Sequence, residues 1–71
     1  MDLKEQQQMI QHTIDGLPEN QRTALILKRF EELSYNEIAD VMQISVSAVE
    51  ALLYRARQNL QKKLAGQLDL P

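Results

Sequence analysis

Seventy-one residues without a cysteine exclude a disulfide framework and a thiolate zinc site, and leave room for a single hydrophobic core. A hydrophobic content of 44% with only 4% aromatics, two glycines and two prolines favours helices over a turn-rich sheet. The net charge of −2 argues against a general polyanion binder, because such binding depends on the summed neutralisation of phosphates.

The charge is distributed unevenly along the chain. Residues 1–50 carry four basic and nine acidic side chains, a balance of −5, whereas residues 51–64 carry four basic side chains and no acidic one. The basic group consists of Arg55, Arg57, Lys62 and Lys63. One segment of an acidic chain is therefore suited to a negatively charged partner.

No targeting or membrane segment is evident. The longest apolar run, residues 24–27, is far too short to span a bilayer, and residues 1–11 lack the apolar stretch of a signal peptide. We expect a soluble, cytoplasmic, single domain over residues 1–66, followed by a flexible tail over residues 67–71, with no membrane partner.

The first two helices are predicted from apolar spacing and from helix-end signals. A thin apolar stripe predicts a helix from Leu3 to Ile14, ending at Gly16, which suits a left-handed cap. Pro18 suits the first helical position of a second helix that runs to about Phe30. Its expected buried face consists of Ala24, Leu25, Leu27 and Phe30.

Two further helices follow. Ser34 and Glu37 have the spacing of a capping box that begins a short third helix with Ile38, Ala39 and Met42 on its inner face. Ser45 suits the N-cap of a longer fourth helix that stops near Gly66. Its apolar positions recur every three or four residues, at Val49, Leu52, Leu53, Ala56, Leu60 and Leu64.

The connection between the third and fourth helices indicates a helix-turn-helix at about residues 34–57. About three residues are too few for antiparallel stacking, so the two helices should cross steeply, with the small Ala39 where they approach. The apolar positions expected in their shared core are Ile38, Met42, Ile44, Val49 and Leu52. Gln43 stands where such turns often carry glycine, because the residue there tends to have a positive φ, at a cost on the order of 1 kcal/mol. The sequence thus predicts an all-α, four-helix domain with a helix-turn-helix, of the winged-helix-like DNA-binding class without a wing.

Four stretches together resemble region 4 of bacterial sigma-70 family factors, especially the extracytoplasmic-function (ECF) group. They are residues 17–19 (LPE), 33–39 (LSYNEIA), 45–50 (SVSAVE) and 54–57 (YRAR), and the resemblance covers roughly residues 10–65. It implies recognition of the promoter −35 element within the RNA polymerase holoenzyme. It also implies a separate region 2 that binds the −10 element, so we expect this chain to be the C-terminal domain of a longer factor.

A helix-turn-helix inserts the N-terminal part of its second helix into the major groove. The positions expected to face bases or the adjacent backbone are Ser45, Val46, Ser47, Glu50, Ala51 and Tyr54. The cations expected to contact phosphates are Arg22, Arg55, Arg57, Lys62 and Lys63. Two alternatives remain open: Glu50 could form a second capping box with Ser47, and Tyr54 could pack on the second helix.

Three other classes of function are alternatives to DNA binding. A protein-interaction module would use the first two helices, with Ile26 and Leu27, and the resemblance suggests the polymerase β-flap or an anti-sigma factor as its partner. A response-regulator output domain resembles the chain up to Val49 but usually lacks the Arg-Ala-Arg segment. An enzyme finds no support, because a single histidine, His12, and no glycine-rich phosphate loop supply no catalytic constellation. We therefore expect no metal, cofactor or small-molecule substrate.

Overall fold

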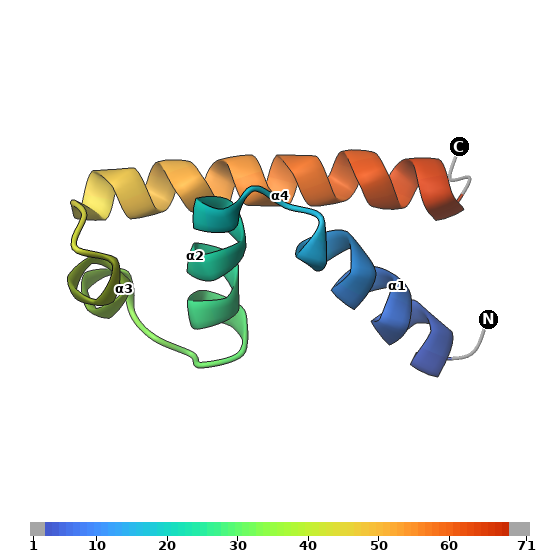
Figure 1. Cartoon of the computed structure of the whole chain (residues 1–71), viewed down its shortest axis with the longest axis horizontal. Coiled ribbons are helices and arrows are strands. Elements are labelled where there is room, and N and C mark those ends of the chain that lie inside the picture. The colour runs from blue at the N-terminus through green and yellow to red at the C-terminus, as the bar shows by residue number, and fades with distance from the viewer. Residues whose placement is uncertain (1–2, 69–71) are drawn as a thin grey trace.

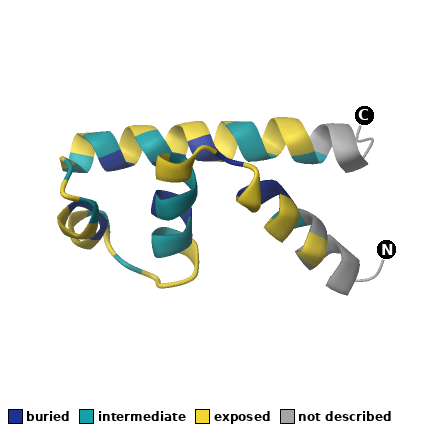
Figure 2. Cartoon of the chain, viewed as in Figure 1, coloured by how far each residue is buried: buried dark blue, intermediate teal, exposed yellow. Residues whose placement is uncertain are grey.

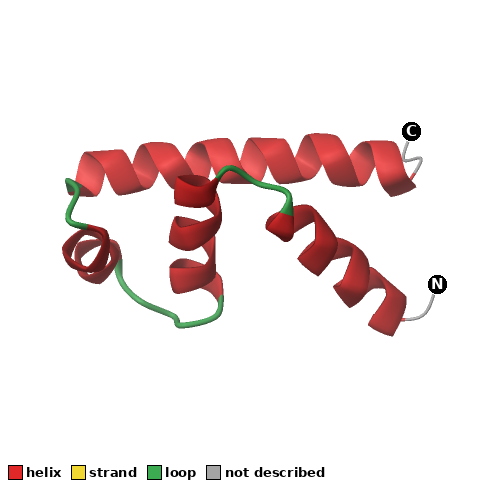
Figure 3. Ribbon diagram, in the orientation of Figure 1, coloured by secondary structure: helices red, strands yellow, loops and turns green. Residues whose placement is uncertain are grey.

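The structure is a computed structural model that describes residues 3–68, with side chains described for residue 8 and residues 10–64. These residues form four helices: α1 (Leu3–Asp15), α2 (Glu19–Arg29), α3 (Tyr35–Met42) and α4 (Val46–Leu68). The described residues contain no strand, so the all-α prediction is confirmed (Figure 3). In Figure 1, α4 runs the full length of the molecule, α3 lies below its first turns, α2 lies below its N-terminal half between α3 and α1, and α1 diverges from its C-terminal half. None of the described helices is long and apolar enough to cross a bilayer.

The end of α1 differs from the sequence-based expectation. Gly16 does not have a positive φ, so the left-handed cap predicted there is wrong. Instead, the Gly16 N–H donates to the Thr13 backbone O at 3.1 Å, and the Leu17 N–H donates to the Ile14 backbone O at 3.0 Å. These hydrogen bonds span three residues and tighten the last turn, which is the other common way of satisfying the carbonyls of a helix end.

The boundaries of α2 and α4 also differ from the prediction. Pro18 is the N-cap of α2, with an extended backbone (φ −53°, ψ 146°), so it precedes the first helical position. Phe30 is the C-cap, and its side chain is 53% exposed, so its predicted place in the buried face is wrong. The reason is that Phe30 lies beyond the last turn of α2 that packs on the core. At the other end, α4 continues to Leu68, past the predicted stop near Gly66, and residues 69–71 of the predicted tail lie outside the described residues.

The loop between α2 and α3 is held by Lys28. Its ammonium group donates to the Leu33 backbone O at 3.3 Å and lies 4.8 Å from the centre of the Tyr35 ring. A cation over an aromatic face is attracted by the negative face of the ring. Lys28 thereby ties the last turn of α2 to the first residue of α3.

Both predicted N-caps are confirmed. The Ser34 hydroxyl accepts from the Glu37 N–H at 3.1 Å, and Glu37 Oε1 accepts from the Ser34 N–H at 2.9 Å, which completes the capping box of α3. The Ser45 hydroxyl accepts from the Ala48 N–H at 3.1 Å at the start of α4. These side chains satisfy backbone donors that have no partner within the helix.

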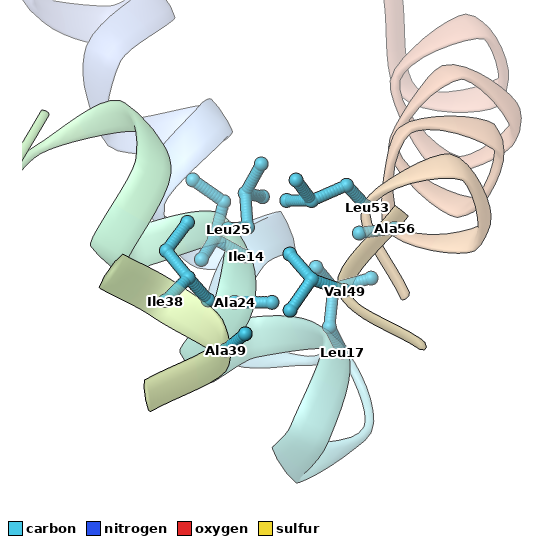
Figure 4. Close-up of a cluster of buried hydrophobic side chains, with 9 residues drawn as sticks. All are labelled: Ile14, Leu17, Ala24, Leu25, Ile38, Ala39, Val49, Leu53 and Ala56. Atoms are coloured by element: carbon cyan, nitrogen blue, oxygen red, sulfur yellow. The ribbon is translucent and has the colours of Figure 1, made fainter. Parts of the chain in front are cut away.

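The core lies where the helices face one another (Figures 2 and 4). Its buried members come from every helix and from the turn after α1: Ile14, Leu17, Ala24, Leu25, Ile38, Ala39, Val49, Leu53 and Ala56. Met42, Ile44, Leu52 and Leu60 are half-buried and pack against this cluster. The predicted inner faces are therefore correct for α3 and for α4 from Val49 to Leu60, whereas Leu64 is half-buried without belonging to this cluster. These contacts hold α4 with its opposite face in solvent.

Candidate nucleic-acid interface

The turn between α3 and α4 positions the second helix of the motif. Gln43 has φ 57° and ψ 47°, which is the left-handed conformation predicted for it. The Ile44 N–H donates to the Ala39 backbone O at 3.0 Å, and the Gln43 N–H donates to the Asp40 backbone O at 3.3 Å. This pair of hydrogen bonds is a Schellman motif, in which a left-handed residue reverses the chain and satisfies the last helical carbonyls. The strain at Gln43 therefore accompanies the turn that sets the direction of α4.

The outer face of α4 carries most of the predicted base-contacting residues. Five of the six are exposed: Ser45, Ser47, Glu50, Ala51 and Tyr54. Val46 differs, because it is half-buried and packs against the core. Positions 47, 50, 51 and 54 follow the spacing i, i+3, i+4 and i+7, so they lie on one side of the helix. The N-terminal half of α4 thus presents a continuous, mostly small and polar surface.

The two alternative interpretations of this face do not hold. The N-cap of α4 is Ser45, so Ser47 lies inside the first turn and cannot be the N-cap of a box with Glu50. Tyr54 does not pack on α2, because its side chain is 62% exposed and its hydroxyl accepts from Gln58 Nε2 at 2.8 Å. Both side chains therefore remain available at the surface of α4.

The five predicted phosphate contacts fall into two groups. Arg55, Arg57 and Lys62 are exposed along α4. Arg22 and Lys63 instead meet at the C-terminal end of α1: Arg22 Nη1 donates to the Asp15 backbone O at 3.1 Å, and Lys63 Nζ donates to the Gly16 backbone O at 3.3 Å. Cations are favoured there because the carbonyls of a helix end carry partial negative charge.

One positioning contact escaped the sequence analysis. Asn59 Nδ2 donates to Gln21 Oε1 at 2.8 Å in a partly buried hydrogen bond between α4 and α2. The two residues are 38 positions apart, and no local pattern connects them. Within the described part of the chain, no group of three or more histidine, aspartate or glutamate side chains converges in a way that could hold a metal ion.

Comparison with known proteins decides the family. Residues 7–60 match the family described as "Sigma-70, region 4". The chain belongs to this family. The matched stretch includes the whole helix-turn-helix with Arg55 and Arg57, and it ends before Lys62 and Lys63. Membership removes the response-regulator output domain as an alternative and confirms the resemblance seen in the sequence.

The relatives of this region 4 domain are sigma factors. The chain is 49% identical over 55 residues to the RNA polymerase sigma-H factor of Pseudomonas aeruginosa, covering 78% of this chain and 28% of that protein. It is 37% identical over 60 residues to the ECF RNA polymerase sigma-E factor of Haemophilus influenzae, covering 84% and 32%. It is 38% identical over 61 residues to the ECF RNA polymerase sigma-E factor of Escherichia coli, covering 86% and 32%. The chain spans about a third of the length of these relatives.

Proposed function

We propose that this region 4 domain recognises the −35 element of bacterial promoters during transcription initiation by cytoplasmic RNA polymerase. The observation that carries the proposal is the exposed face of the first turns of α4, which the Schellman turn holds clear of the other helices. The sigma-factor relatives support the same role. The proposal assigns the domain no catalytic activity, cofactor or small-molecule substrate.

The side chains on this face match the groups of the major groove. Ser47 can donate to or accept from a base edge or a phosphate, and the methyl group of Ala51 can contact the methyl group of thymine. The Glu50 carboxylate can accept from cytosine N4, and it has no hydrogen-bond or ion-pair partner among the described residues. Ser45 and the exposed part of Val46 lie at the tip of the helix. Glu50 is therefore the proposed determinant of sequence preference.

Arg55 and Arg57 are placed to contact both strands of the DNA. Successive residues of an α-helix are rotated by about 100°, so Arg55 and Arg57 lie about 160° apart, one on each flank of the face that carries Ser47 and Tyr54. A helix inserted in a major groove about 12 Å wide has one sugar-phosphate backbone on each flank. Arg55 and Arg57 would then contact phosphates of opposite strands, with Lys62 further along α4.

The test is fluorescence anisotropy of the domain with a labelled random-sequence duplex pool at low and physiological salt. We expect salt-sensitive binding that the Arg55→Ala/Arg57→Ala variant loses across all sequences, because phosphate contacts carry no sequence information. Arg29→Ala is the control, since it removes an exposed cation from α2 rather than α4. Selection from the pool should give different preferred sites for wild type and Glu50→Gln. Absence of binding even at low salt would contradict the proposal.

A second candidate function is docking on a protein, either the polymerase β-flap or an anti-sigma factor. The observation that favours it is the exposure of two large apolar side chains outside α4, Phe30 (53%) and Val41 (61%). Ile26 and Leu27, which the sequence suggested for this role, are half-buried and pack against the core.

Capture of core polymerase by the immobilised domain tests this second function. Phe30→Ser/Val41→Ser should lose capture yet keep duplex binding, whereas Arg55→Ala/Arg57→Ala should do the reverse. Undiminished capture by the Phe30→Ser/Val41→Ser variant would rule out these side chains as the docking surface.

A further inference from the structure

We propose that Gln58 is a positioning residue that holds the Tyr54 hydroxyl as a hydrogen-bond donor to a phosphodiester oxygen of bound DNA. The inference rests on the proposed function and adds a residue that the sequence analysis did not single out. It is carried by one contact on the outer face of α4, the hydrogen bond of 2.8 Å from Gln58 Nε2 to Tyr54 Oη.

This hydrogen bond leaves the proton of the Tyr54 hydroxyl free to be donated. A tyrosine hydroxyl has one proton to donate and can also accept, and the Gln58 amide uses its accepting capacity. Among the described residues no acceptor bonds to the Tyr54 O–H, so the proton is available to an outside group.

The hydrogen bond with Gln58 also restricts the conformations of the Tyr54 side chain. Its ring is 62% exposed, and a tyrosine with an apolar body and a polar tip is a side chain that interfaces favour. Gln58 stands one turn further along α4, at the i+4 position, where the two side chains are neighbours. Restricting the phenol before binding lowers the conformational entropy lost when it meets its partner. A hydrogen bond accepted by the hydroxyl also strengthens the one that it donates.

The position on α4 selects phosphate as the acceptor. Tyr54 is eight residues after Val46, about 12 Å along a helix that rises 1.5 Å per residue. The major groove is about 8.5 Å deep, so a helix that enters by its N-terminus reaches the level of the phosphates at this distance. Arg55 and Arg57 lie on either side of Tyr54, and both suit phosphate contacts. Tyr54 lies at the same level along α4 as these two arginines, so a helix that brings Arg55 and Arg57 to the phosphates also brings the Tyr54 hydroxyl above the base edges, within reach of a phosphodiester oxygen.

A double-mutant cycle tests the assignment. Wild type, Tyr54→Phe, Gln58→Ala and the double variant are titrated by anisotropy against the labelled duplex selected with the wild-type domain. We expect Tyr54→Phe to weaken binding about threefold to tenfold, the loss of one hydrogen bond. Gln58→Ala should weaken binding about threefold in the wild-type background and have no effect in the Tyr54→Phe background, because Gln58 acts only through the hydroxyl.

Two further measurements separate this role from a structural one. The salt dependence of the dissociation constant should be the same in all four proteins, because the substituted groups are neutral and release no counterions. Duplexes with a single neutral methylphosphonate should include one position that weakens wild type but leaves Tyr54→Phe unaffected. Gln61→Ala is the matched control, an exposed glutamine on the same helix, and it should bind as wild type does.

Several outcomes would overturn the inference. Unchanged affinity of Tyr54→Phe, together with loss of binding by Arg55→Ala/Arg57→Ala, would remove this inference and leave the proposed function intact. Additive effects of the two substitutions would show that Gln58 does not act through Tyr54. A change in base preference in Tyr54→Phe would show that the hydroxyl contacts a base. Failure of the wild-type domain to bind any duplex would remove both proposals.

Discussion

Among the residues that the structure describes, two non-glycine residues have a left-handed backbone, Glu32 in the α2–α3 loop and Gln43 in the helix-turn-helix, each with φ 57°. At Gln43 the conformation permits two hydrogen bonds to carbonyls of α3. A residue with a Cβ atom pays for this conformation with backbone strain, whereas glycine does not. Gln43 therefore stabilises the turn through its backbone and not through its side chain.

Gln43→Gly should raise the free energy of unfolding by about 0.5–1 kcal/mol, because relief of the strain outweighs the entropy that glycine gains in the unfolded chain. Urea unfolding followed by circular dichroism measures the change. Gln61→Gly is the control: it lies inside α4, where glycine costs about 1 kcal/mol. Equal destabilisation by the two substitutions would contradict the account of the turn.

Glu37 makes the stability of the domain depend on pH in the acid range. Its pKa is lowered from the ordinary value of 4.5, chiefly by the hydrogen bond from the Ser34 backbone N–H, then by the Ser34 side chain and by the charge of Lys28. Because the unfolded chain holds this proton more tightly than the folded one, the carboxylate stabilises the fold above pH 4.5. That contribution is lost as the pH falls through the lowered pKa of the folded state.

Glu37→Gln should therefore flatten the fall in stability below pH 4.5, since a glutamine keeps the geometry of a capping box but does not titrate. Urea midpoints of wild type and variant, measured from neutral pH into acid, provide the comparison. A variant that loses stability in acid as steeply as wild type would show that the capping carboxylate is not responsible.

At the scale of the helix, α3 depends on its surroundings. Its eight residues are too few for a stable isolated helix, so capping and burial must hold it. The capping box fixes its first turn, and Ile38 and Ala39 are buried against α4. Val41, three residues after Ile38, lies beyond the edge of this buried face and is 61% exposed. The stability of the helix-turn-helix thus depends on the buried residues of α3.

Ile38→Ala should lower the free energy of unfolding by about 2–5 kcal/mol, because Ile38 has no exposed surface and its truncation leaves a cavity. Val41→Ala, three residues further along the same helix, should change it by less than about 0.5 kcal/mol. Thermal and urea unfolding of both variants test the difference. Comparable losses would mean that Ile38 and Val41 do not differ in burial as the structure indicates.

At the scale of the whole molecule, the basic residues differ in what they contact. Arg55, Arg57 and Lys62 are exposed on α4, whereas Arg22 and Lys63 cap the end of α1. Each cation that neutralises a phosphate adds about 0.9 to the slope of log Kd against log salt concentration. The number of cations that contact DNA can therefore be measured directly.

We expect a slope of about 2.7, the value for three phosphate contacts. The measurement is a titration of the selected duplex at a series of salt concentrations, repeated for Lys63→Ala, which should leave the slope unchanged. A slope near 4.5 that Lys63→Ala lowers would show that Arg22 and Lys63 leave α1 and contact phosphates.

Much of this domain follows from short-range patterns in its sequence. The four helices, the caps at Ser34 and Ser45 and the left-handed Gln43 depend on residues within one or two turns of each other, so periodicity and cap chemistry predict them. The family is predicted in the same way, because each stretch that resembles region 4 is a short run of consecutive residues. The DNA contacts of α4 stay a prediction.

Other features were decided only by the tertiary structure. The exposure of Phe30 and the packing of Val46 depend on where neighbouring helices end. Lys63 caps a carbonyl 47 residues away, and Asn59 bonds to Gln21 across 38 residues. A basic side chain next to a predicted recognition helix has the same pattern whether it faces a phosphate or a helix end. The packing of α1 and α2 against α4 brings carbonyl oxygens within reach of Arg22 and Lys63 and leaves Arg55, Arg57 and Lys62 in solvent, a difference that depends on how the helices pack and that no short-range pattern contains.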